Sequence, residues 1–161
     1  MSTKTRETEI EVDQKVPLIR ITRDFDAPPE KVFRAHTDPD LFARWIGPRS
    51  LETRIANFDC RTGGSYRYLM VRGEDQFGFY GSFHEIRQNE LIVQTFTFDG
   101  EPDGVALERL TFTDLGDGRT RLTSTSLVDS FEARDAFVAT GMDVGVREGY
   151  EKLDEVLSAE G

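Results

Sequence analysis

The sequence has little cysteine, little histidine and no long apolar run, and each shortage excludes a class of protein. Its one cysteine, Cys60, has no second thiol in the chain to pair with, as expected for a reducing compartment. One cysteine and two histidines offer no spacing typical of metal ligands, so we expect no metal and no cofactor. No apolar segment approaches the length of a membrane span, and residues 1–15 lack the apolar core of a secretion signal. We therefore expect a cytoplasmic protein.

Positive charge is also scarce. Lysine and arginine number 20 against 30 aspartates and glutamates, so the formal net charge is −10. This charge would repel a phosphate backbone and an anionic membrane surface. We expect neither nucleic acid nor a membrane among the partners.

The length and the hydrophobic content together predict one domain. The chain has 161 residues, of which 37% are hydrophobic, and this is enough to build a core. Residues 1–15 predict a polar N-terminal tail, although the segment TEIEV within it alternates as a strand does. Residues 16–161 are expected to form the single domain, without internal repeats or a linker.

Alternation of apolar and polar residues predicts a sheet of seven strands. The first strand covers residues 17–25, and six more follow between residues 51 and 128, separated by turn residues such as Gly63-Gly64 and Asp117-Gly118. Connections this short imply an antiparallel meander. A sheet of this size twists and curls, so one of its faces becomes concave.

Helices are predicted before and after the six-strand segment of the sequence, because apolar residues recur there at helical spacing. Two short helices are predicted between residues 26 and 48, where Gly47-Pro48 ends the second. A long helix is predicted from Phe131 to Ala159, with Ser130 as its N-cap. The fold class is therefore α+β. We expect a helix-grip fold, in which a curved seven-stranded antiparallel sheet has two short helices after strand one and a long C-terminal helix over its concave face.

Three glycines at intervals of four, Gly141, Gly145 and Gly149, lie on one stripe of this long helix. Glycine in a helix interior is about 1 kcal/mol less favourable than alanine, so the stripe needs a reason. Three explanations stay open: close packing of the helix on bulky rings, a break near Gly141, or a cavity between helix and sheet. The third is the functional hypothesis, because concave apolar sites bind small molecules.

Strand parity predicts which side chains would line such a cavity. Alternate residues of three strands are rich in aromatic rings, and Glu85 and Glu108 are the exceptions within these rows. If a bulge near Gly78 or Gly81 shifts the parity, both carboxylates point to solvent; if Glu85 points inward, it is the best candidate for a polar contact to a ligand. The candidate ligand-binding residues are Trp45, Tyr66, Tyr68, Phe79, Phe83, Glu85, Phe112, Met142, Gly145 and Gly149.

No catalytic constellation is recognisable, so no catalytic residue is assigned. His36 is expected to point inward from the first short helix, and His84 outward from its strand, so the two should not meet. A single inward histidine is more typical of a hydrogen-bonded core residue than of a catalyst. The serines after Gly64 and Gly81 lack the strand-to-helix context of a nucleophile elbow. Cys60 lies near Arg61, which could lower its pKa, but an incidental thiol is the simpler interpretation.

Six stretches resemble a known family, in the family's order and spacing. They are ITRDFDAPPEKVFRAHTDPDLFARWIGP, DCRTGGSYRYLM, GSFHEI, ELIVQTF, LTFTDLGDGRTRLT and ARDAFVATGMDVGVREGYEKLDEVL. From about residue 17 to residue 158 the chain resembles the START-like, Bet-v-type superfamily called SRPBCC. Within it, the chain is similar to the family named for the C-terminal domain of the activator of the heat-shock-protein-90 ATPase.

This resemblance implies a START-like helix-grip domain with a cavity under the long helix, and it does not imply one activity. Relatives in the superfamily bind lipids, hormones or polyketides, a few catalyse cyclisation or hydrolysis, and the namesake stimulates a chaperone ATPase. Two positions depart from the family pattern. His36 stands where a large aromatic residue is frequent, and Val146 where a tryptophan is frequent, so the pocket is expected to differ from those of relatives.

These observations predict a cytoplasmic protein that binds a small apolar or aromatic molecule between sheet and C-terminal helix. One alternative is an interaction protein that acts on a chaperone or another partner through its surface. The other is a cyclase- or hydrolase-like enzyme that uses the same cavity. The sequence leaves open the ligand, the partner, the choice between monomer and homodimer, and the direction of Glu85, Glu108 and His36.

Overall fold

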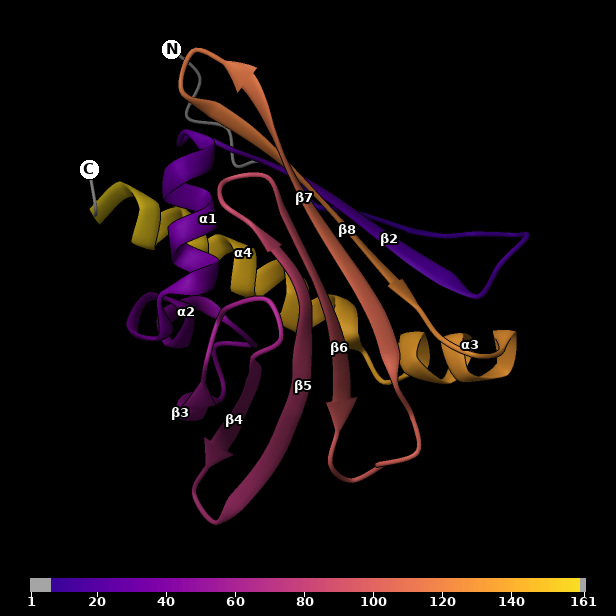
Figure 1. The fold of residues 1–161 in the computed structure, drawn as a ribbon. Coiled ribbons are helices and arrows are strands. Elements are labelled where there is room, and N and C mark those ends of the chain that lie inside the picture. Colours follow the sequence, from indigo (N-terminus) through magenta and orange to yellow (C-terminus); the bar gives the residue numbers. More distant parts are fainter. Residues whose placement is uncertain (1–6, 160–161) are drawn as a thin grey trace.

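The segments that alternate between apolar and polar residues form one antiparallel sheet (Figure 1). The computed structural model describes residues 7–159, and within them eight strands lie in the order β1-β2-β8-β7-β6-β5-β4-β3. The strands are β1 (Glu9–Val12), β2 (Leu18–Phe25), β3 (Glu52–Phe58), β4 (Ser65–Arg72), β5 (Asp75–Arg87), β6 (Leu91–Phe98), β7 (Ala106–Gly116) and β8 (Arg119–Leu127).

The α+β class and the antiparallel meander are confirmed, because β3 to β8 are neighbours in chain order. The predicted count of seven strands is wrong. The additional strand, β1, comes from the segment predicted as a tail, whose residues 1–6 lie outside the described residues. Ile10 of β1 is paired with Ile21 of β2 and packs against the core. The alternation of TEIEV therefore forms a strand although the segment is charged.

Four helices lie within the described residues, and turn chemistry explains their ends. They are α1 (Pro29–Thr37), α2 (Pro39–Trp45), α3 (Phe131–Ala139) and α4 (Met142–Ala159). Asp38 separates the first two and caps α2, since its side chain accepts hydrogen bonds from the backbone N–H groups of Asp40 and Leu41. None of the helices within residues 7–159 has the length and hydropathy that a membrane span requires.

The prediction of one continuous C-terminal helix is wrong. Gly141 has a φ of 82°, in the left-handed region where glycine commonly ends a helix, and α4 begins immediately after it. The break near Gly141 was one of the three explanations for the glycine stripe. Figure 1 shows that α3 and α4 run in different directions on either side of it.

The helices cover one face of the sheet, which we call the helix face. Figure 1 shows α4 crossing this face, with α1 and α2 beside it. Side chains of the helix face form the core together with α4: Ile19, Phe25, Leu122 and Leu153 expose at most 1% of their surface. The opposite face of the sheet is called the outer face below.

Candidate functional site

The aromatic residues predicted to contact a ligand lie on the helix face or on α2, and most of them are buried. The residues that expose at most 5% of their surface are Trp45, Tyr66, Tyr68, Phe83 and Phe112. Their rings contact one another: the ring centroids of Tyr66 and Phe83 lie 5.1 Å apart, and those of Tyr68 and Phe79 lie 5.4 Å apart. Such packing is typical of an aromatic core.

Trp45 and Phe112 enclose His36, whose direction the sequence left open. The imidazole is buried, its Nδ1 lies 2.8 Å from the Val32 carbonyl oxygen, and its ring centroid is 4.7 Å from that of Trp45. Trp45 donates its own N–H to the Ala35 carbonyl at 2.8 Å. Burial lowers the pKa of His36 to about 4, so the ring is neutral at pH 7. His36 is a core residue that links α1 to the sheet.

The glycine stripe faces α2 and the turn after it, so it gives no support for a hollow against the sheet. A Cβ on Gly149 would lie 3.1 Å from the Trp45 carbonyl oxygen, and one on Gly145 would lie 3.5 Å from Cδ of Pro48. Close packing therefore explains Gly149, and the helix break explains Gly141. Met142, also predicted at the site, is half-buried at the start of α4.

Glu85 lies on the outer face, so the structure does not place it where a ligand under α4 would meet it. Phe83 pairs with Gln94 on the helix face, but a bulge at His84 shifts the register, and Glu85 pairs with Val93 on the outer face. Its carboxylate bonds to Arg87 Nε at 3.0 Å, and the same contact lowers the pKa of Glu85. The parity that placed Phe83 and Glu85 on one face is wrong because of this bulge.

Glu108 is the carboxylate that points under the helices. It lies on the helix face between Gln94 of β6 and Ser126 of β8, its partners in the sheet register. Gln94 Nε2 donates to one carboxylate oxygen at 2.9 Å, and Ser126 Oγ donates to the other at 2.6 Å. Burial raises the pKa of Glu108, and the two hydrogen bonds oppose this rise. Yet Glu108 and Gln94 remain partly exposed.

Three tyrosines lie within electrostatic reach of Glu108. Burial raises the pKa of Tyr66, Tyr68 and Tyr150, and the Glu108 charge raises it further. The Tyr66 hydroxyl donates to the Thr95 carbonyl at 2.6 Å. No hydrogen bond to another described residue is seen for the hydroxyls of Tyr68 and Tyr150, and both residues are buried.

Several apolar side chains of the helix face and of the helices are only half-buried. Phe96 lies two residues from Gln94 on the same face of β6, and its ring stacks on Phe79 at 5.5 Å between centroids. On the helices, Phe137 and Val146 pack against the core in the same partly exposed way. The helix face thus combines accessible rings with one fixed carboxylate. The sequence marked Glu108 as an exception within an apolar row but left its direction open, and no local pattern marked Gln94 or Ser126.

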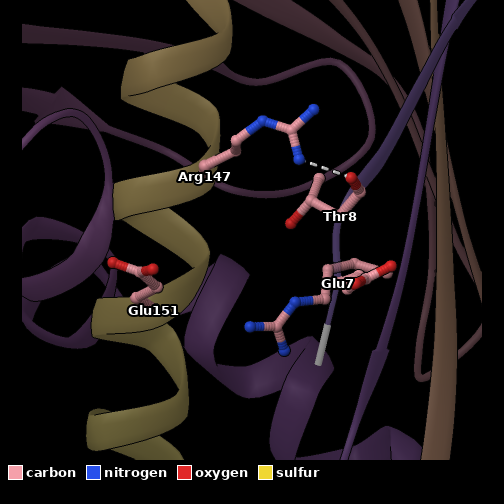
Figure 2. A pocket seen from close by; sticks show the side chains of 5 residues that line it. Glu7, Thr8, Arg147 and Glu151 are labelled. Carbon is pink, nitrogen blue, oxygen red and sulfur yellow. Dashed lines mark hydrogen bonds between the residues drawn. The ribbon is translucent and has the colours of Figure 1, made fainter. Parts of the chain in front are cut away.

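A pocket of about 450 Å³ lies between the N-terminal segment and α4, and its lining is polar. It is lined by Glu7, Thr8, Arg23, Arg147 and Glu151. Figure 2 shows Arg147 reaching from α4 to the Thr8 carbonyl, to which it donates a hydrogen bond at 2.6 Å. None of the residues predicted as ligand contacts lines this pocket.

Comparison with known proteins identifies relatives of this fold. Residues 26–158 match the family described as activator of Hsp90 ATPase homolog 1-like protein. A protein of Arthrobacter aurescens is 26% identical with a TM-score of 0.86, over 94% of this chain and 91% of that one. A protein of Rhodobacter sphaeroides is also 26% identical with a TM-score of 0.86, over 95% of this chain and 99% of that one.

Protein Ms6760 of Mycobacterium smegmatis is 24% identical, with a TM-score of 0.84 over 93% of this chain and 96% of that one, and so shares the fold. No significant match is found among curated proteins. The family match covers α1, α2, β3 to β8, α3 and all but the last residue of α4, and it leaves out β1 and β2. The resemblance seen in the sequence is confirmed: the chain belongs to the activator of Hsp90 ATPase homolog 1-like family.

Proposed function

We propose that this protein binds a small, largely aromatic molecule on the helix face of its sheet, where Glu108 accepts a hydrogen bond from it. The observation that carries the proposal is Glu108, a half-buried residue on the helix face whose carboxylate is held by two hydrogen bonds near the half-buried ring of Phe96. A carboxylate among apolar groups is unfavourable unless hydrogen bonds stabilise it, and Gln94 and Ser126 supply two. An ionised carboxylate has about four acceptor positions, so about two remain for a ligand.

The chemistry of the ligand follows from these groups. An N–H or O–H group on the ligand would donate to Glu108, and the Tyr68 and Tyr150 hydroxyls would contact a neighbouring polar atom. Phe79 and Phe96 offer the edge of a ring stack to an aromatic body. Fixed polar groups within an apolar surface are typical of small-molecule sites, in which they set orientation and specificity.

The test compares two probes of similar shape, N-phenyl-1-naphthylamine and 1-phenoxynaphthalene, of which only the first has an N–H group. Fluorescence titration should give tighter binding of the amine to the wild-type protein. A hydrogen bond to a charged group contributes about 1.5–3 kcal/mol, or roughly a 10- to 100-fold difference in Kd. Glu108→Gln should remove most of this preference.

Glu85→Gln is the matched control, because it makes the same change on the outer face and should leave both Kd values unchanged. The proposal fails if neither probe binds, or if Glu108→Gln keeps the preference for the amine.

The family match favours a second candidate function, stimulation of a chaperone ATPase through the protein surface. This candidate is tested by adding the wild-type protein and Glu108→Gln to an Hsp90-type ATPase. Equal stimulation by both proteins would support a surface function that is independent of Glu108. No stimulation by the wild-type protein would remove this candidate.

A further inference from the structure

The polar pocket between the segment before β1, β2 and α4 has an unused donor in its wall. Arg23 exposes only 1% of its surface and donates from both terminal nitrogens to the Asp154 carboxylate, at 2.9 and 2.7 Å. Its third nitrogen, Nε, is buried and has no hydrogen-bond partner among the described residues. A buried N–H without a partner is unfavourable, and an acceptor in the pocket would relieve it.

Arg147 brings a second guanidinium to the same pocket (Figure 2). Its Nη1 donates to the Thr8 carbonyl at 2.6 Å, and no hydrogen bond within residues 7–159 uses its Nε or Nη2. Nε and Nη2 form the edge of a guanidinium that holds a carboxylate with two parallel hydrogen bonds. The contact to Thr8 fixes Arg147, so this edge is already oriented.

The charges of the residues that line the pocket limit the charge of an anion that could bind there. Arg23 is neutralised by Asp154, so Arg147 supplies the remaining positive charge of the lining, against the negative charges of Glu7 and Glu151. Glu151 follows Arg147 by one helical turn and lines the same pocket, and in Figure 2 its carboxylate points away from that guanidinium. Glu7 and Glu151 both repel a second negative charge on a ligand. The lining therefore disfavours a phosphate dianion, and a monoanion would be held by directed hydrogen bonds and not by a net positive charge.

We propose that this pocket is a second binding site, which takes a small organic acid through its carboxylate group. Arg147 holds the carboxylate from Nε and Nη2, and the Arg23 Nε–H donates from the floor of the pocket. The site does not rest on the function proposed for Glu108, which lies on β7 and lines no part of this pocket. The volume of about 450 Å³ lies in the range typical of small-molecule pockets.

Sodium benzoate and neutral benzamide form a matched pair of probes, titrated at constant ionic strength. Nitrogen-15 NMR of the arginine Nε–H groups should show saturable shifts of the Arg23 and Arg147 signals with benzoate, and none with benzamide. Arg147→Gln should weaken benzoate binding at least tenfold, since it removes both parallel hydrogen bonds. Glu151→Gln should tighten it about twofold, because one repelling charge is lost.

Arg54→Gln is the control, because Arg54 is an exposed arginine paired with Glu52 on β3 and its loss changes the net charge equally. The proposal is overturned if benzoate shifts neither arginine signal, if benzamide binds as tightly, or if Arg54→Gln weakens binding as much as Arg147→Gln. If Arg147→Gln does not fold, the wild-type arginine signals and the Glu151→Gln titration decide the question in the same way.

Discussion

His36 should make the fold sensitive to mild acid. The ring exposes 5% of its surface, and its Nδ1 lies 2.8 Å from the Val32 carbonyl oxygen, so Nδ1 carries the proton of the neutral ring. Nε2 is buried without a partner in the described part of the chain. Protonation would add an unpaired N–H and a charge between the rings of Trp45 and Phe112.

The size of the effect follows from the pKa. Burial lowers the pKa of His36 from 6.5 to about 4, and the hydrogen bond to Val32 opposes this only in part. The unfolded chain therefore binds the proton first as the pH falls, so stability declines below about pH 6.5 and the decline ends near pH 4. One pKa unit corresponds to about 1.36 kcal/mol, which gives about 3 kcal/mol in total and about 2 kcal/mol by pH 5.

Urea unfolding at pH 7 and pH 5, followed by circular dichroism, measures this contribution. The wild-type protein should lose about 2 kcal/mol more of its free energy of unfolding between these pH values than His36→Phe does. His84→Gln is the control, because it removes the other imidazole of the chain from an exposed position. Equal pH dependence of wild type and His36→Phe would refute the reasoning.

Three further predictions concern reactivity and packing. Burial raises the pKa of Cys60 to about 11. Its alkylation by iodoacetamide at pH 8, followed by mass spectrometry, should therefore be roughly 100-fold slower than that of free cysteine, and an equal rate would contradict this. Gly149→Ala places a Cβ 3.1 Å from a backbone oxygen and should destabilise by about 1–2 kcal/mol in urea unfolding. Gly145→Ala meets only ordinary contacts and should stabilise by about 0.5–1 kcal/mol, so changes of the same sign would refute the packing argument. Asp154→Asn leaves Arg23 buried with a weakened partner and should lower the free energy of unfolding by about 3 kcal/mol, whereas a neutral effect would show that the ion pair is dispensable.

Much of this fold could be predicted because each element has a local signature. The strands alternate and end at turn residues such as Asp117-Gly118, both of which have a positive φ. Two features of the structure differ from the prediction, namely the additional strand β1 and the division of the C-terminal helix into α3 and α4. β1 exists because Ile10 can pair with Ile21 and reach the core, and α4 begins at Met142 because Gly141 takes a left-handed φ. Neither the formation of β1 nor the start of α4 can be predicted from the periodicity of apolar residues alone.

The polar residues of the site could be predicted only in part, because the strand register decides which face they occupy and which residues they contact. Glu85 and Glu108 both interrupt an apolar row, and the sequence treats them alike. The one-residue bulge at His84 turns Glu85 to the outer face, while β7 is regular around Glu108. Gln94 and Ser126 become partners of Glu108 only through the pairing of β6, β7 and β8.

The glycines of the stripe do not form the hollow that the sequence led us to expect. Missing side chains at Gly145 and Gly149 bring α4 against α2 and the following turn, and so they close space there. The break at Gly141 instead separates α3 from α4, and the apolar residues on its two sides, Phe137 and Met142, stay half-buried. The three glycines therefore have different roles: Gly141 ends α3 through its left-handed φ, whereas Gly145 and Gly149 let α4 approach α2 and the turn after it.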